Sequence, residues 1–256
     1  MIESLVKSAF RMLGFDISRR TSVPHNPFDA QKSFLKDMGI IKPVIFDIGA
    51  HRGETIEQYR ARFPETEIYS FEPFPDSLAF LRTKFINDPY TKIIPLAVAD
   101  KAGQRTFYVN EIDATNSLLR VATDVRRYLP RRGTTKAKLQ VEVTSVDEFV
   151  KNNSVKKIDI LKMDIQGGEL MALKGAAKTL KEQQIPVIYT EIGYVSHYEN
   201  QPLFYEIWIF LNQFGYSLFD LYHLAKAPNG QIIRGDALFV SHDVRRNVID
   251  RYPEEP

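Results

Sequence analysis

The stretch "VIFDIGAHRGET", residues 44–55, decides the fold. Apolar residues that favour strands lead into Asp47, and the chain then turns through Gly49 and Gly53 before a predicted helix over 54–63. A buried strand that ends in a carboxylate beside a glycine turn is typical of a ligand site at the carboxyl edge of an open α/β sheet.

The composition sets limits on the class of protein. The chain has 256 residues, 44% of them hydrophobic and 26% charged, which is ordinary for a globular protein with a sizeable core. The formal net charge of +2 provides no global field that would recruit nucleic acid. The absence of cysteine excludes disulfides and cysteine zinc sites, and it favours a cytoplasmic location.

Strands and helices are expected to alternate along most of the chain. The pattern predicts a parallel sheet built from βαβ units. Strands are expected at 43–48, 66–72, 91–100, 158–167 and 186–193. Helices are expected at 30–37, 54–63, 75–87 and around 204–211, and one more should carry Leu170, Leu173, Ala177 and Leu180 on one face.

Two regions depart from this alternation. Residues 103–149 are interpreted as an insertion, with strands expected at 105–110 and 139–149 around an Arg-rich stretch. At the C-terminus, the turn at 227–231 predicts an antiparallel pair of strands at 216–223 and 236–241. We therefore expect an N-terminal helical extension, 1–40, and one α/β domain, 41–256.

The glycine turn discriminates between two cofactor classes. A dinucleotide requires G-x-G-x-x-G, but the position of the second glycine is His51, which obstructs the approach of a pyrophosphate. S-adenosylmethionine (SAM) has no pyrophosphate, and its methionine portion fits a tight turn. Asp47 is expected to take the SAM ammonium, directly or through water. Glu72, at the end of the second predicted strand, is expected to hold the ribose hydroxyls.

The rest of the expected cofactor site comes from neighbouring strand ends. If the glycine turn and Glu72 were unrelated, the glycines would only form a turn and Glu72 would be a surface acid. The glycine spacing, the strand context and the acid together favour SAM. The expected set is completed by Gly49, Ala50, His51, Gly53 and Thr55 of the turn, by Pro73, Ala97 and Val98, and by Asn116 and Asp164.

A second acidic cluster provides the candidate catalytic residues. The segment "LKMDIQGGELMALKGA", 161–176, again runs from a strand through a carboxylate into a glycine turn. An alcohol is a poor nucleophile while it is protonated, so a base should lie beside the acceptor. Asp164 is the first candidate, followed by Glu191 and His197, although a lone histidine is more often structural.

Three polar residues are expected to contact the acceptor: Ser117, Gln166 and Glu169. Ser117 fits turn formation equally well, and Glu169 fits a first-turn acid that complements the helix dipole. Asp164, Glu169 and Glu191 offer oxygen ligands suited to Mg²⁺, but they lack a partner at short fixed spacing, so no metal site is predicted.

At this point the sequence resembles the FkbM family of SAM-dependent methyltransferases. The matching pieces occur in the family's order across about 43–193: "FDIGAHRGET", "YSFEPFPDSLAFL", "PLAVADKAG", "TNSLL", "VTSVDEF", "LKMDIQGGELMALKGA" and "YTEIG". The chain departs from the family pattern at His51–Arg52 and at Gly168.

The resemblance implies a class I methyltransferase fold: Rossmann-like α/β, a mostly parallel sheet with helices on both faces, and an antiparallel C-terminal hairpin. It also implies methylation of a hydroxyl, often on a sugar or a secondary metabolite.

Other functions and partners stay open. The basic residues between 120 and 138 fit a solvated surface or an anion clamp for a phosphorylated acceptor. They are the only support for an RNA methyltransferase, so nucleic acid is not the expected partner. The apolar stripe over 2–13 fits docking on the chain's own domain, a homodimer, or peripheral membrane contact through 1–20 with a lipid-linked acceptor. A non-catalytic module that binds a protein partner is the remaining alternative.

Overall fold

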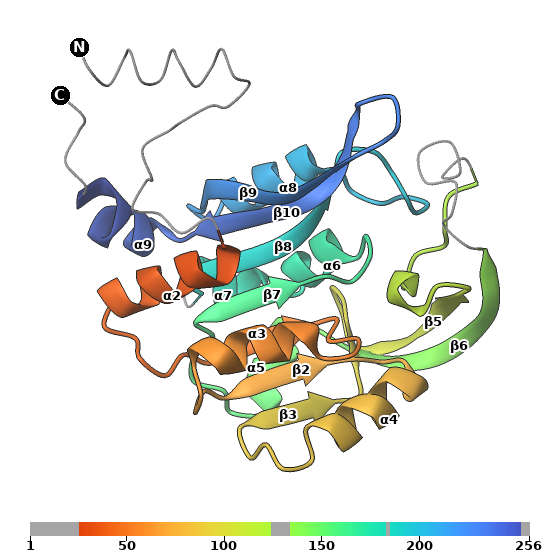
Figure 1. Cartoon of the computed structure of the whole chain (residues 1–256), viewed down its shortest axis with the longest axis horizontal. Coiled ribbons are helices and arrows are strands. Elements are labelled where there is room, and N and C mark those ends of the chain that lie inside the picture. The colour runs from red at the N-terminus through yellow and green to blue at the C-terminus, as the bar shows by residue number, and fades with distance from the viewer. Residues whose placement is uncertain (1–25, 124–133, 183–184, 252–256) are drawn as a thin grey trace, which may run out of the picture.

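The computed structural model describes residues 26–123, 134–182 and 185–251. They form a seven-stranded sheet covered by helices on both faces. A three-stranded sheet lies beyond the carboxyl ends of the larger sheet's parallel strands (Figure 1). Residues 1–25, on which the predicted N-terminal stripe falls, lie outside the described part.

The central sheet reverses its strand order at β1. The order is β3 (Thr91–Ile94), β2 (Ile68–Phe71), β1 (Ile45–Ile48), β7 (Ile160–Met163), β8 (Val187–Gly193), β10 (Ile232–Val240) and β9 (Ser217–Lys226). The first five strands are parallel, and β10 runs antiparallel to both of its neighbours. Because the chain leaves β1 toward β2 and returns on the other side at β7, the crevice beyond these strand ends is the expected ligand position.

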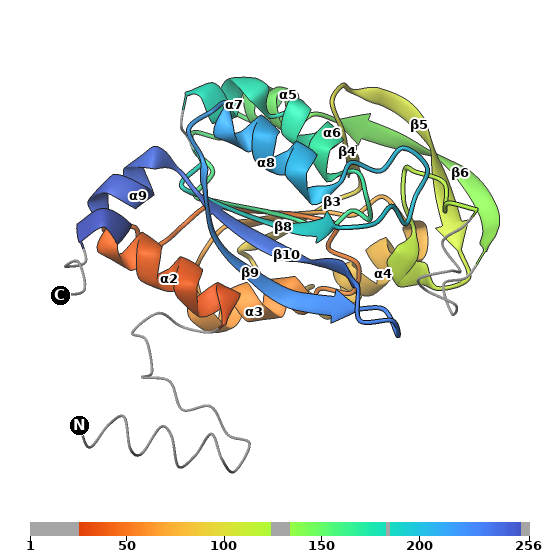
Figure 2. The same cartoon turned by 90° about the horizontal axis from the view of Figure 1, so that it is seen from above.

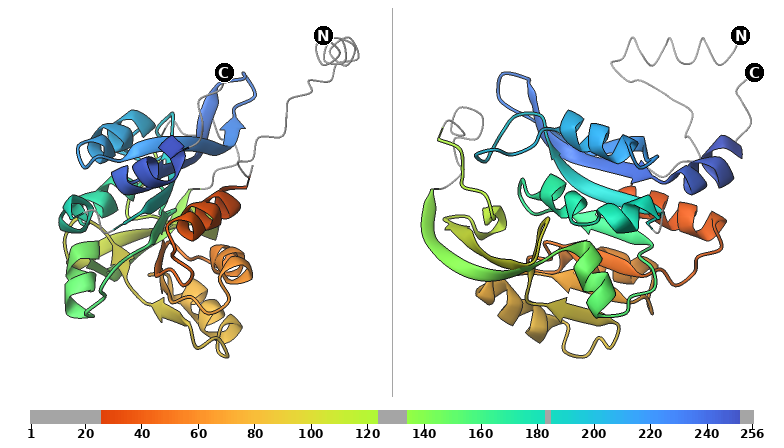
Figure 3. Two further views of the ribbon diagram at one scale, coloured as in Figure 1. Left: turned by 90° about the vertical axis from the view of Figure 1, so that its left-hand side faces the viewer. Right: turned by 180° about the vertical axis from the view of Figure 1, so that it is seen from behind.

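Helices cover both faces of this sheet (Figure 2). One layer contains α2 (Pro27–Asp37), α3 (Glu54–Arg62), α4 (Pro75–Lys84) and α9 (His242–Asn247), with the turn η3 (Ile249–Arg251) after it. The other contains α5 (Val146–Asn152), α6 (Glu169–Lys174), α7 (Ala177–Lys181) and α8 (Phe204–Asn212). In the left view of Figure 3, α2, α3 and α4 lie on one side of the sheet and α6, α7 and α8 on the other.

Side chains alternate between the two layers along each strand, as the pleat requires. In β1, Ile45 packs with α2 and α3, whereas Phe46 packs against Phe149 of α5. These observations confirm the predicted architecture: a mostly parallel sheet, helices on both faces and an antiparallel C-terminal pair.

The predicted insertion provides two of the three strands of the small sheet. Its order is β4 (Ala97–Val98), β6 (Thr135–Thr144) and β5 (Gly103–Asn110), and the short helix η1 (Asp113–Thr115) follows β5. Figure 1 shows it on the side toward which the parallel strands point. Residues of the insertion therefore reach the carboxyl edge of the central sheet.

The prediction of a single third strand over 91–100 was wrong. The central strand β3 ends at Ile94, and Ala97–Val98 pairs with β6 in the small sheet. Pro95 has no backbone N–H, so it cannot continue the ladder of hydrogen bonds.

Two further elements end earlier than predicted. The strand expected over 139–149 stops at Thr144, because Ser145 caps α5 by accepting a hydrogen bond from the Glu148 N–H at 3.2 Å. The single helix expected after Asp164 is divided into α6 and α7 at Gly175. A Cβ there would lie 2.1 Å from the Ala99 carbonyl oxygen, so the backbone passes close to another segment.

In the part of the chain that the structure describes, no helix is long and apolar enough to cross a membrane.

Candidate functional site

The glycine turn after β1 packs directly on the neighbouring strand ends. Gly49 has a φ of +86°, and a Cβ at this position would lie 2.0 Å from the Asp164 carbonyl oxygen. The N–H groups of Gly49 and Ala50 both donate to the Phe71 carbonyl, at 3.0 and 3.1 Å. Since these contacts connect β1, β2 and β7, the turn has a fixed position beside the crevice.

Glu72 is held at the end of β2 by backbone donors. Its Oε2 accepts from the His51 N–H at 2.8 Å, and its Oε1 accepts from the Phe74 N–H at 2.9 Å. The side chain is largely buried, and burial raises its pKa to about 7 although these two hydrogen bonds oppose the shift. The turn and the acid therefore form one unit at the tips of β1 and β2.

A cavity of about 600 Å³, its open mouth included, lies over this unit. Eight of the predicted cofactor residues line it: Gly49, His51, Glu72, Pro73, Ala97, Val98, Asn116 and Asp164. So does Gln166, which was expected to contact the acceptor. The remaining lining residues include Ile48, Phe71, Ser77, Leu96, Phe107, Asp113, Ala114, Leu118, Ile165 and Gly168.

Four predicted cofactor residues do not reach the cavity wall. Asp47 is fully buried beneath the turn, and Ala50 packs into the core below α3. Gly53 caps α3 with a φ of +82°, and a Cβ there would lie 2.4 Å from the Phe85 ring. Thr55 lies in the first turn of α3.

The insertion provides the outer wall. Asp113 of η1 accepts a hydrogen bond from Arg52 at 2.7 Å, and its other oxygen lies 3.5 Å from His51 Nε2. The Arg52 guanidinium lowers the pKa of Asp113, so this carboxylate stays ionised beside the turn. Asn116 Oδ1 accepts from the Asn110 N–H at 2.8 Å. Its Nδ2 is buried and has no hydrogen-bond partner among the described residues.

Across the cavity, Gln166 connects two carboxylates. Its Nε2 donates to Asp164 Oδ1 at 2.8 Å and to Glu191 Oε2 at 2.9 Å. Its Oε1 lies 2.8 Å from the Tyr198 hydroxyl, which also lies 2.9 Å from the Thr115 carbonyl. One amide thus joins the ends of β7 and β8 to the loop after β8, and Tyr198 extends the network to the insertion.

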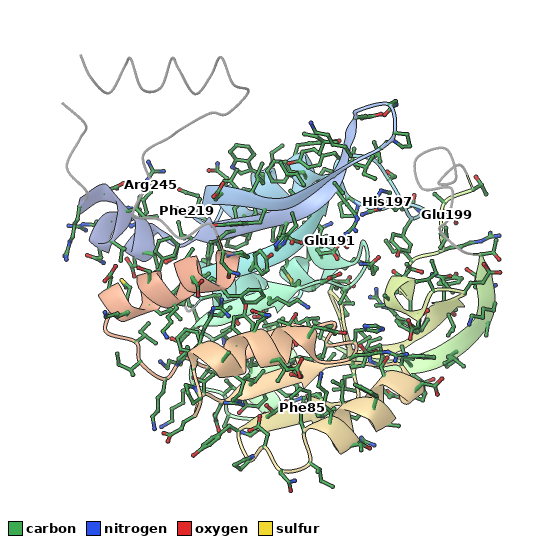
Figure 4. The ribbon with its side chains drawn as sticks, viewed as in Figure 1. Phe85, Glu191, His197, Glu199, Phe219 and Arg245 are labelled. Atoms are coloured by element: carbon green, nitrogen blue, oxygen red, sulfur yellow. The ribbon has the colours of Figure 1, made fainter. Side chains whose placement is uncertain are left out.

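The other two candidate bases differ from Asp164 in position. Glu191 does not line the cavity, and its Oε1 accepts a 3.3 Å hydrogen bond from Arg234. His197 is buried, and its backbone N–H donates to Gln201 Oε1 at 2.6 Å. Figure 4 shows Glu191 on β8 and His197 farther along, in the loop that follows.

Two residues expected to bind the acceptor instead bond to the backbone. Ser117 Oγ donates to the Gln166 carbonyl at 2.8 Å, which ties the insertion to the turn after β7. Glu169 Oε1 accepts from the N–H groups of Ile165 and Gly167 at 3.0 and 3.2 Å. Burial raises the pKa of Glu169 to about 7.

Sequence reasoning missed three polar residues at this edge: Asp113, Lys162 and Tyr198. A signal existed for Lys162, since a lysine within an apolar strand is seldom buried without a partner. Asp113 and Tyr198 lie in irregular segments whose local sequence contains no signal of what they contact.

The sequence also offers carboxylate oxygens for a metal and an Arg-rich tract for an anion. Among the residues that the structure describes, no three His, Asp or Glu side chains are grouped so as to hold a metal ion. Most of the arginines of the basic tract, at 126, 127, 131 and 132, fall outside the described ranges.

Comparisons with known proteins agree on one family. Its sequence profile, described as "Methyltransferase FkbM domain", matches residues 47–218. The 2-O-methyltransferase NoeI of Sinorhizobium fredii is 26% identical over 166 residues, covering 62% of this chain and 67% of NoeI. The hexuronic acid methyltransferase AglP of Haloferax volcanii is 26% identical over 154 residues, covering 59% of this chain and 56% of AglP.

A solved structure supports the fold. The crystal structure of methyltransferase FkbM from Methylobacillus flagellatus aligns with a TM-score of 0.51 at 16% identity, covering 78% of this chain and 44% of that one. The likeness confirms the class I methyltransferase fold.

Proposed function

Because this chain belongs to the FkbM family of SAM-dependent methyltransferases, we propose that it transfers a methyl group from SAM to a hydroxyl of a sugar, a glycan or a small metabolite. The observation that carries the proposal is the placement of Glu72 and Asp164 on one cavity at the switch point of the sheet. The family inferred from the motifs is confirmed, whereas the acceptor is part of the proposal.

The cavity chemistry fits SAM. Glu72 is a carboxylate fixed by two backbone donors, and it suits paired ribose hydroxyls. Leu96, Ala97 and Val98 form an apolar flank for a purine. The buried Asn116 Nδ2 needs an acceptor, and a ring nitrogen of adenine is a suitable one.

SAM supplies an electrophilic methyl group on its sulfonium. The protein must then align the acceptor oxygen, exclude water and take the hydroxyl proton. Alignment alone can contribute on the order of 7–11 kcal/mol. A base within hydrogen-bond reach adds about 10²–10⁴-fold.

Asp164 is the best-placed base. It lines the cavity, and the neutral amide of Gln166 holds one of its oxygens, which orients the carboxylate without an ion pair to that oxygen. Glu191 shares the same amide but is also bound by the Arg234 guanidinium, which occupies it. We assign proton removal at the acceptor oxygen to Asp164, and we assign Glu191 a role in placing Gln166.

The acceptor class is supported by the relatives. By their names, NoeI is a 2-O-methyltransferase and AglP methylates a hexuronic acid. A saccharide hydroxyl is therefore the first acceptor to test. A phosphorylated or lipid-linked acceptor, membrane contact and a homodimer stay predictions.

A labelled-methyl transfer assay tests the function. The purified protein is incubated with methyl-labelled SAM and a panel of saccharides, uronic acids, glycolipids and cell extracts, and products are identified by mass. We expect label on a hydroxyl oxygen. Label retained on RNA would instead support the nucleic-acid alternative. Calorimetric titration with SAM tests the non-catalytic module: no binding would favour it, whereas binding with turnover excludes it.

A further inference from the structure

A buried lysine lies beneath the glycine turn. Lys162 is in β7, at the position that pairs with Asp47 of β1, and both side chains are almost fully buried on the α3 side of the sheet. Lys162 Nζ lies 3.0 Å from Asp47 Oδ1 and donates to the Gly49 carbonyl at 3.0 Å. Neither residue lines the cavity.

Packing alone does not explain this pair. A buried ion pair often contributes no more to stability than apolar residues of the same volume, because both charges lose their hydration. Asp47 has no hydrogen bond of good geometry to the described residues, so the ion pair with Lys162 is its main compensation. Burial by itself favours the neutral amine, yet the carboxylates of Asp47 and Asp164 raise the pKa of Lys162 and keep it charged.

The contact with Gly49 determines the orientation of one peptide plane. The Gly49 carbonyl and the Ala50 N–H belong to the same rigid unit and point in opposite directions. Lys162 binds the carbonyl end at 3.0 Å, and the Phe71 carbonyl binds the N–H end at 3.1 Å. The next N–H, of His51, is the donor to Glu72. Lys162 therefore acts at the base of the backbone segment that orients Glu72, the carboxylate expected to hold the SAM ribose.

We infer that Lys162 is a positioning residue that sets the glycine turn for SAM, and that Asp47 holds Lys162 instead of binding the cofactor. The inference rests on the proposed function, since it names SAM as the ligand of this turn. It differs from the sequence expectation, in which Asp47 takes the SAM ammonium.

Two variants separate the roles of the pair. Asp47→Asn keeps a side-chain oxygen that can accept a hydrogen bond from Lys162, and Asp164 still favours the charged amine, so Lys162 should stay on the Gly49 carbonyl. Asp47→Asn/Lys162→Met removes the amine from that carbonyl without leaving a buried carboxylate unpaired. Calorimetric titration with SAM should give an affinity within about threefold of wild type for the first and at least about tenfold weaker for the second. Asp47→Val/Lys162→Leu is a second charge-free pair in case the first does not fold.

Amide hydrogen exchange provides a readout that does not depend on SAM. In the charge-free pairs, the amides of residues 50–53 should exchange at least about tenfold faster than in wild type. If wild type does not bind SAM, the proposed function fails, while this measurement still tests whether Lys162 holds the turn.

A matched control is available at the other end of β7. Lys157 Nζ lies 2.9 Å from the buried carboxylate of Asp159, far along the strand from the turn. Lys157→Met should leave SAM affinity and exchange at 50–53 unchanged. Wild-type affinity and exchange in the charge-free pairs would overturn the inference, as would an Asp47→Asn variant that loses as much affinity as the double variant.

Discussion

The two sides of the cavity are built in different ways. On the β1–β2 side, backbone N–H groups of His51 and Phe74 fix the carboxylate of Glu72. On the β7–β8 side, the side chains around Gln166 hold one another: its Nε2 donates to Asp164 and to Glu191, 25 positions away, and its Oε1 accepts from Tyr198, 32 positions away.

Because of this difference, the two sides are suited to different ligands. Backbone donors keep their places when neighbouring side chains change, so the β1–β2 side suits a ligand that stays the same, the methyl donor. A side-chain network changes with each substitution, so the β7–β8 side suits an acceptor that differs among proteins of one fold. Four predictions test this comparison.

The largest effect is expected at Asp164. Asp164→Asn retains the shape but cannot take a proton, so kcat should fall by about 10²–10⁴-fold. SAM affinity should stay within about threefold of wild type, because the β1–β2 side is intact. Turnover assays and calorimetry measure the two quantities. Asp220→Asn, at an exposed position of β9, is the control; normal turnover in Asp164→Asn would refute the assignment of the base.

Glu72→Ala should affect only the β1–β2 side of the cavity. It removes a buried carboxylate that suits two ribose hydroxyls, and charge-assisted hydrogen bonds of this kind contribute roughly 1.5–3 kcal/mol each. SAM affinity should fall by about 100-fold or more. Glu67→Ala, at the opposite end of β2 where Glu67 pairs with Lys92, should not change it. Equal SAM affinity in Glu72→Ala and Glu67→Ala would show that the β1–β2 side does not hold the cofactor through Glu72.

Gln166→Met should have a smaller effect, confined to turnover. Methionine has a similar length but cannot bind Asp164 and Glu191 together. We expect kcat to fall by about tenfold, in proportion to one or two lost hydrogen bonds, with SAM affinity unchanged. The exposed Gln213 at the end of α8 gives the control Gln213→Met. A large loss of SAM affinity would show that the two sides are not independent.

The last prediction concerns the pH dependence of stability and not activity. Burial raises the pKa of Glu72 and of Glu169 to about 7. Between their ordinary values and about 7 the folded chain binds more protons than the unfolded chain, so the free energy of unfolding should fall as pH rises. Each carboxyl contributes at most about 3 kcal/mol.

Chemical denaturation near pH 5 and near pH 8 measures this dependence. Glu72→Gln should remove the part of it that comes from the Glu72 carboxyl. SAM affinity should change in the opposite direction, since the ribose hydroxyls require the ionised Glu72. If stability were the same at both pH values, burial would not control these carboxyls.

Much of the β1–β2 side could be predicted from the sequence alone. An apolar run, two glycines and an acid at the next strand end are local signals, and the parallel topology brings such ends together. Gly49 and Glu72 therefore lie on the cavity, as expected. The alternation of strands and helices over 43–94 and the C-terminal turn are equally local, and the structure confirms them for the same reason.

Only the tertiary structure decided the rest. The helix is divided at Gly175, where the backbone passes close to the Ala99 carbonyl, Asp113 of the insertion binds Arg52 of the turn, and Lys162 pairs with Asp47 beneath it. Each of these depends on two segments that meet only after folding, so neither segment alone contains the signal. A residue's type limits the chemistry it can perform, and its packing partners determine whether that chemistry faces the ligand or the core.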